Sequence, residues 1–151
     1  MAQGSLTAGL AVGLTDVSGA HALAEAIGGL YGHPHGYCCA VSMPAIMEYN
    51  MPVSADKYAR LAVALGADHP GFTQSQLAHA AVAAIRDLNA DLGVPPIRDL
   101  IKTEDLDVLA DKAEANTSTP SNPRAASAAD YRVMFSRELE TGVNQHKGLQ
   151  R

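Results

Sequence analysis

The chain has 151 residues, of which 47% are hydrophobic and 18% charged, and its formal net charge is -5. This length allows one domain with a buried core, and the composition is typical of a globular protein. The acidic balance and the lack of a basic patch exclude the usual nucleic-acid-binding surface, so we expect no nucleic-acid partner. No stretch approaches the roughly 18 apolar residues that a membrane-spanning helix needs, so we expect no membrane partner.

The first residues, MAQGSLTAGLAVGL, contain an apolar run without a preceding Lys or Arg, which argues against a signal peptide. The only cysteines, Cys38 and Cys39, are adjacent in the chain. Adjacent cysteines rarely pair with each other, because disulfide geometry is demanding. We therefore expect a reducing, cytoplasmic location, with both cysteines packed as small apolar residues rather than acting as metal ligands.

Apolar residues recur with helical spacing along nearly the whole chain, and no convincing alternating pattern predicts a strand. In chain order, we expect helices over residues 4–14, 18–32, 34–50, 54–66, 73–93, 102–116 and 127–139. Ser18, Ser54 and Thr73 are placed to cap three of these helices. Pro95 and Pro96 predict an extended or turning segment, since both forbid continuation of a helix.

The order of these segments predicts an all-α bundle of helices joined by short loops. Abundant alanine supports this, because alanine is the best helix former and lets helices approach closely. No internal repeat or shift in composition marks a second domain, so we expect one helical domain over residues 1–140. The polar residues 141–151 are expected to be disordered.

The segment HALAEAIGGLYGHPHG, residues 21–36, contains three of the six histidines. On one continuous helix, His21 and His35 would lie about 21 Å apart, too far to share a ligand. The glycines and Pro34 break that helix, so two helices folded against each other can bring both imidazoles to one metal ion. A lone histidine is more often a surface or core residue, and the spacing alone leaves both interpretations open.

Three longer segments, AHALAEAIGGLYGHPHG, AVSMPAIMEYN and KYARLAVALG, follow one another in this order. Together they resemble the C-terminal domain of the iron-dependent (group III) alcohol dehydrogenases, whose pattern joins an upstream histidine to a Pro-His-Gly motif. The segments LNADLGVPPIRDL, EDLDVLADKA and NPRAASAADYRVMFSREL resemble the end of the same domain. The likeness runs from about Leu6 to Leu139 and implies the helical, dehydroquinate synthase-like fold of that domain.

In that family one divalent iron, sometimes zinc, is held by an aspartate and three histidines. The resemblance assigns the last two histidine ligands to His21 and His35. It also implies Fe²⁺ or Zn²⁺ as a cofactor, NAD or NADP as the oxidant, and a small alcohol or aldehyde as the substrate. The apolar helix at residues 6–14 matches an element that packs beside the site in the family.

One turn after the first of these histidines, the family usually has another histidine, near the nicotinamide and the substrate. This chain has Glu25 there, four residues after His21 and on the same helix face. A carboxylate at this place could orient an imidazole, bind the metal, or act as a general acid or base. A solvated surface pair with His21 is the simpler alternative.

Two family features have no counterpart here. No Asp precedes a His by four residues, so the Asp-x-x-x-His motif that supplies the other metal ligands is absent. No predicted strand precedes the Gly-containing residues 3–13, so they are not the phosphate-binding turn of a nucleotide domain. We therefore expect the chain to match roughly the last third of such an enzyme, to bind its metal weakly and to be inactive alone.

A complementary N-terminal domain, or self-association, is expected to cover the apolar surface that such a part would expose. NAD(P) would then be bound only through that other domain. The alternatives are a non-catalytic helical interaction module and a truncated remnant of such an enzyme.

Overall fold

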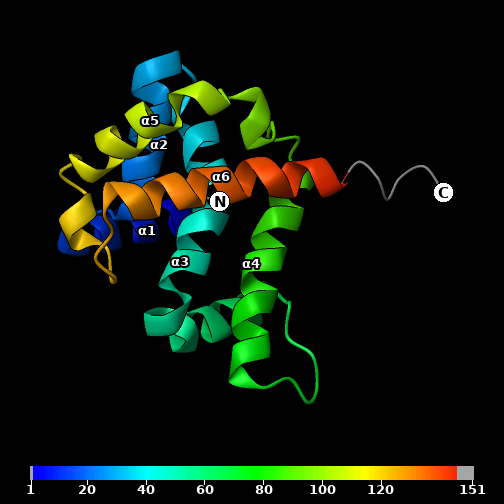
Figure 1. Cartoon of the computed structure of the whole chain (residues 1–151). Helices are drawn as coiled ribbons and strands as arrows, with labels where there is room; N and C mark the ends of the chain where they lie inside the picture. Colours follow the sequence, from blue (N-terminus) through cyan, green and yellow to red (C-terminus); the bar gives the residue numbers. More distant parts are fainter. Residues whose placement is uncertain (1, 146–151) are drawn as a thin grey trace.

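The computed structural model describes residues 2–145. Over these residues all regular structure is helical, which confirms the predicted all-α class (Figure 1). The α-helices are α1 (Ala2–Thr15), α2 (Gly19–Tyr31), α3 (His35–Ala64), α4 (Gln74–Asp91), α5 (Leu106–Glu114) and α6 (Ala128–Gln145). Short 3-10 turns cover η1 (Ile97–Asp99), η2 (Thr103–Asp105) and η3 (Thr119–Ser121). None of the described helices has the length and apolar character needed to cross a membrane.

Helix α3 is a single helix where the sequence predicted two. Pro44 and Pro52 both lie inside it, and Figure 1 shows its second part turning away from the axis of its first part. Proline removes a backbone hydrogen bond and crowds the preceding turn, so it bends a helix that packing holds together. Ser54, expected as an N-cap, is instead buried inside this helix.

Two apolar clusters hold the helices together. The larger joins α2, the first part of α3, α5 and α6, and includes the fully buried aromatic rings of Tyr131 and Phe135. The smaller joins both parts of α3 to α4 through Met47, Ala62, Ala81 and Val82. Because both parts of α3 contribute to the smaller cluster, the tertiary packing outweighs the local tendency of the prolines to end the helix.

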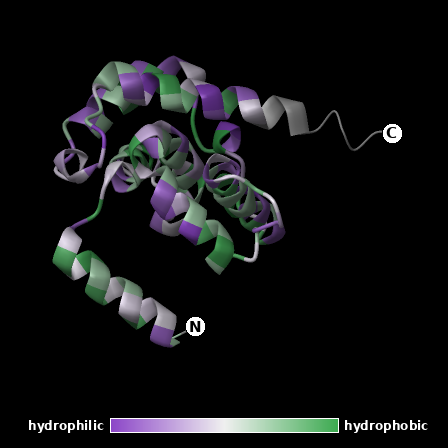
Figure 2. Cartoon of the chain, turned by 90° about the horizontal axis from the view of Figure 1, so that it is seen from below, coloured by the Kyte–Doolittle hydropathy of each residue, from purple (hydrophilic) through white to green (hydrophobic). Residues whose placement is uncertain are grey.

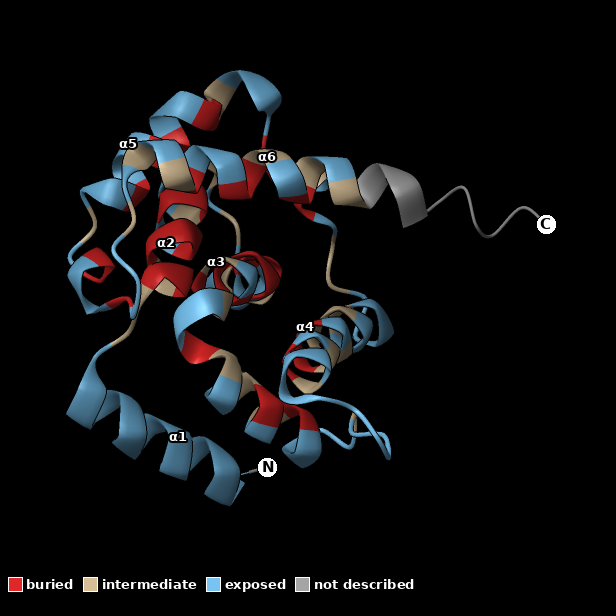
Figure 3. Ribbon diagram, turned by 60° about the horizontal axis from the view of Figure 1, so that its bottom comes forward, coloured by how far each residue is buried: buried red, intermediate tan, exposed pale blue. Residues whose placement is uncertain are grey.

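Helices α2 and α3 run antiparallel and approach each other closely. A Cβ atom at Gly19 would lie 2.6 Å from Cδ1 of Ile46, and one at Gly28 would lie 3.9 Å from Sγ of Cys38. The chain reverses between them at Gly32, whose φ of 73° suits glycine at the end of a helix. Figure 3 shows α2 as the most continuously buried helix of the bundle.

Helix α1 stands apart from the rest of the bundle, as both Figure 2 and Figure 3 show. None of its residues is buried, and Leu6, Leu10 and Leu14 are 66%, 64% and 87% exposed. The resemblance implied that this helix packs beside the histidines. The structure does not place it there. Asp16, with a φ of 69°, turns the chain between α1 and α2.

Helix α6 continues beyond the boundary expected from the sequence. Residues 141–145, predicted as the start of a polar tail, belong to this helix, which ends at Gln145. Residues 146–151 of the predicted tail lie outside the described residues.

Candidate metal centre

Contacts with the segment before α5 hold the turn between α2 and α3. The Nε2 atom of His33 lies 3.0 Å from the carbonyl oxygen of Leu100. The hydroxyl of Tyr31 donates to the carboxylate of Asp105 at 2.6 Å and accepts a backbone N–H of the same segment at 3.0 Å. His33 lies in the loop between α2 and α3. These bonds position the start of α3, where His35 lies.

Two imidazoles and one thiol converge between α2 and α3. The ring centroids of His21 and His35 lie 5.3 Å apart, with the ring planes inclined at 49°. The Sγ atom of Cys39 lies 3.2 Å from Nε2 of His35. One possible ligand atom from each of the three residues lies within 4.8 Å of the other two. The structure thus brings the two predicted histidines together, while their role as metal ligands stays a prediction.

Sequence reasoning missed Cys39 as part of this group. Cys38 is fully buried in the larger core, as expected of a small apolar residue, whereas Cys39 is only half-buried. Cys39 follows His35 by four residues, so both side chains lie on one face of α3. This His-x-x-x-Cys spacing is the sequence pattern that could have identified it.

The surroundings of Cys39 favour the neutral thiol over the thiolate. Burial raises the pKa of Cys39, and the nearby Cys38 and the carboxylate of Glu25 raise it further. A neutral thiol and an imidazole nitrogen 3.2 Å apart can share a hydrogen bond. A metal ion that binds here must therefore displace the thiol proton.

Glu25 is placed on the same helix as His21 but is engaged elsewhere. Its carboxylate is exposed and accepts a hydrogen bond of 2.7 Å from Nδ2 of Asn116, in the loop after α5. The three converging ligand atoms therefore do not include it. Its predicted part in catalysis stays a prediction.

The donor set fits a divalent transition-metal ion. With metal–nitrogen bonds of about 2.0–2.1 Å and metal–sulfur bonds of about 2.3 Å, the ligand atoms of a tetrahedral site lie about 3.3–3.6 Å apart. The separation of 3.2 Å between His35 and Cys39 is close to this value. All three ligand atoms lie within 4.8 Å of one another. Bringing the most distant pair to the tetrahedral spacing needs a side-chain shift of about 1 Å, which the half-exposed His21 can make.

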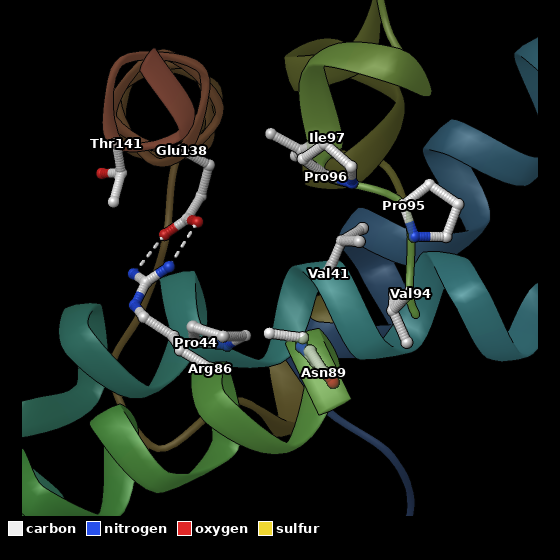
Figure 4. Close-up of a pocket in the computed structure, with 11 residues that line it drawn as sticks. Val41, Pro44, Arg86, Asn89, Val94, Pro95, Pro96, Ile97, Glu138 and Thr141 are labelled. Carbon is white, nitrogen blue, oxygen red and sulfur yellow. Dashed lines mark hydrogen bonds and ion pairs between the residues drawn. The ribbon is translucent and has the colours of Figure 1, made fainter. Parts of the chain in front are cut away.

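The concavity drawn in Figure 4 is a different feature, between α3, α4 and α6. Its polar groups are paired with protein partners: Arg86 binds the carboxylates of Glu138 and Glu48, and Asn89 donates to the carbonyl of Ala40. The hydrogen bonds from Arg86 to Glu138, and then to Glu48, raise the pKa of the guanidinium group. This concavity is therefore lined by groups that join helices rather than groups offered to a ligand.

The fold and the paired histidines agree with one protein family. The C-terminal part of the Fe-containing alcohol dehydrogenase family matches residues 1–139. The chain belongs to the iron-containing alcohol dehydrogenase family. This membership confirms the resemblance found in the sequence and assigns the chain to the C-terminal domain of that family.

Individual members of the family show the same relationship. The 1,3-propanediol dehydrogenase of Klebsiella pneumoniae is 35% identical over 137 residues, which cover 89% of this chain and 35% of that protein. The lactaldehyde reductase of Escherichia coli K12 is 34% identical over 89% of this chain and 36% of its own length. The solved alcohol dehydrogenase from Oenococcus oeni has a TM-score of 0.82 and 33% identity, over 87% of this chain and 35% of that one. The chain thus spans about a third of the length of these relatives.

Proposed function

We propose that this chain forms the metal-binding part of an iron-type, NAD(P)-dependent alcohol dehydrogenase. The observation that supports this is the convergence of His21 and His35 from two separate helices, with ring centroids 5.3 Å apart. Similarity to a 1,3-propanediol dehydrogenase and a lactaldehyde reductase favours a small alcohol or aldehyde as the substrate.

The two histidines are the residues assigned to hold Fe²⁺ or Zn²⁺. Such an ion supplies a Lewis acid for the oxygen of the alcohol or aldehyde. The antiparallel contact of α2 with α3 sets the separation of the imidazoles, and His33 holds the turn between them. Glu25, one turn beyond His21 and exposed to solvent, is assigned to exchange a proton with substrate or water.

The remaining parts of the site are assigned to polypeptide outside these 151 residues. The relatives are about three times as long as the part that matches, which leaves room for a nucleotide-binding domain that holds NAD(P). Few protein ligands leave an ion open to solvent, so the affinity of this chain alone is expected to be weak. The two unpaired, adjacent cysteines favour a reducing, cytoplasmic compartment.

Metal titration tests the assignment of the two histidines. Zn²⁺ or Fe²⁺ added to the purified chain under anaerobic conditions should give a saturable calorimetric signal, which the His21→Ala, His35→Ala double variant should lose. The matched control is the His69→Ala, His79→Ala double variant, which removes two exposed imidazoles elsewhere. An unchanged binding curve in the first double variant would overturn the proposal.

A helical interaction module is the second candidate function. It is favoured by α1, an uncharged helix that buries none of its residues and exposes three leucines. In that case the chain would associate through α1 without any need for the histidine pair, and metal binding would be absent.

A further inference from the structure

We propose that Cys39 is a third metal ligand, so that His21, His35 and Cys39 form a site selective for borderline-soft divalent cations such as Zn²⁺. This inference rests on the proposed function, because it adds a ligand to the histidine pair assigned there. With Cys39 included, the chain offers two nitrogen donors and one sulfur donor.

The geometry of α3 places the sulfur where a ligand is needed. His35 and Cys39 lie one helical turn apart on the same face, and their Nε2 and Sγ atoms are 3.2 Å apart. This is close to the separation of about 3.3–3.6 Å between two ligands of one tetrahedral metal ion. His21 reaches the same point from α2, so the three donors come from two helices that are already packed together.

The two neighbouring cysteines differ in the way that this role requires. Cys38 is fully buried in the apolar core and faces the carbonyl oxygen of His33. Cys39 is half-buried, beside the exposed His35, and an ion from solvent can reach it. Cys38 therefore provides a matched control, with the same chemistry one position away in the chain.

The charge of a thiolate suits this position. His21 and His35 lie in the first turns of α2 and α3, where the helix dipoles are positive and disfavour a bare cation. A thiolate ligand offsets part of the charge of the ion, while its proton passes to solvent on binding. Thiolate and imidazole together select Zn²⁺ and similar ions over Mg²⁺ and Ca²⁺, which prefer oxygen ligands. Three protein donors leave a fourth position open, as in catalytic rather than structural zinc sites.

Cobalt(II) is a suitable probe, because a thiolate–cobalt bond produces a charge-transfer absorption band in the near ultraviolet and imidazole ligands do not. The full chain is titrated with Co²⁺ under reducing, anaerobic conditions and then with Zn²⁺ in competition. We expect the band in the wild-type chain and in Cys38→Ala, and its loss in Cys39→Ser. Removing a residue that only hydrogen-bonds a metal ligand already lowers metal affinity by about 10–100-fold. Loss of a direct ligand should therefore weaken Zn²⁺ binding by Cys39→Ser at least about tenfold relative to the wild type.

The outcomes separate this inference from the proposed function. Circular dichroism confirms beforehand that each variant is folded, and Cys39→Ala repeats the test if Cys39→Ser is not. One outcome is that metal binding needs both histidines, but no thiolate band appears and Cys39→Ser has no effect. This outcome overturns the role of Cys39 and leaves the proposed role of the histidine pair intact. Both proposals are overturned if the wild-type chain binds neither Co²⁺ nor Zn²⁺. They are also overturned if the His21→Ala, His35→Ala variant binds these ions as tightly as the wild type does.

Discussion

At the scale of single residues, the ion pair of Arg86 with Glu138 is the most deeply placed charge interaction in the described part of the chain. The side chains are 21% and 8% exposed, and two hydrogen bonds of 2.8 and 2.6 Å join them across α4 and α6 (Figure 4). A buried carboxylate without its partner is strongly unfavourable, because water cannot solvate it. The pair therefore joins these helices in one register.

Arg86→Met is expected to lower the free energy of unfolding by about 3–5 kcal/mol, because it leaves the carboxylate of Glu138 buried and unpaired. The control is Arg132→Met, since Arg132 pairs with Asp107 where both side chains are largely exposed. That change should cost no more than about 1 kcal/mol. Urea unfolding of both variants checks this, and equal losses would contradict the special role of Arg86.

At the scale of elements, α6 begins with a reciprocal cap. The carboxylate of Asp130 accepts from the hydroxyl and the backbone N–H of Ser127 at 2.6 and 2.9 Å, and the backbone N–H of Asp130 donates to that hydroxyl at 3.3 Å. These bonds satisfy backbone donors that the first turn of a helix leaves free. The hydrogen bonds from Ser127 lower the pKa of Asp130.

A lowered pKa in the folded state makes this cap sensitive to acid. Its stabilisation is fully present above the unfolded pKa of about 3.9 and is lost as the pH falls through the lower, folded value. Asp130→Asn should thus reduce stability at neutral pH by about 0.5–1 kcal/mol, and the deficit should vanish in strong acid. Thermal unfolding from neutral to acidic pH measures this, with the exposed Asp111→Asn on α5 as control. A deficit that persists unchanged in acid would refute the explanation.

At the scale of the whole molecule, the exposed face of α1 calls for a partner. Leu6, Leu10 and Leu14 are four residues apart, so they form one stripe on a helix that has no charged residue. Figure 2 shows this apolar helix projecting from the bundle. A contiguous apolar surface of this kind promotes association.

We therefore predict that the chain self-associates through α1. Burial of each leucine contributes about 1.5–3 kcal/mol, so replacing all three by serine should weaken association more than about tenfold. Sedimentation over a range of concentrations and binding of a hydrophobic dye measure this. A variant with serine at Leu65, Leu88 and Leu92, which are exposed on other elements, should behave as the wild type. A wild-type monomer at high concentration that binds no dye would refute the prediction.

We also predict that the 151-residue chain alone does not reduce NAD or NADP with small primary alcohols and added Fe²⁺. Holding both reactants together supplies about 7–11 kcal/mol of barrier reduction. All regular structure in the described residues is helical, so these residues offer no strand–turn–helix unit for a nucleotide pyrophosphate. Absorbance of the reduced nicotinamide is the readout, and turnover that disappears in His35→Ala would prove the prediction wrong.

Local patterns in the sequence predicted most of the helical structure correctly. Thr73 caps α4 through a reciprocal bond with Gln76, and Gly93, with a φ of 67°, follows the end of that helix. Ser127, the first residue of the helix predicted over residues 127–139, caps α6. These features could be predicted because capping and chain reversal depend on residues within a few positions of one another.

The same local patterns failed where distant residues decide the structure. The sequence predicted separate helices over residues 34–50 and 54–66, but packing of both parts of α3 against α4 keeps them one helix. Residues Asn50 and Asn122 exchange two buried hydrogen bonds of 2.9 and 2.8 Å although they are 72 positions apart. No local spacing encodes such a contact.

For the candidate site, sequence patterns were enough to predict that His21 and His35 flank a broken helix and match a motif of the iron-containing alcohol dehydrogenases. Which donors converge depends on the folded chain, which brings Cys39 to the histidines and turns Glu25 toward Asn116. Spacing along a chain limits which residues can meet on one helix, whereas this group of donors needs side chains from two helices. Their meeting depends on how α2 and α3 pack, which is settled by the core that these helices share with α5 and α6.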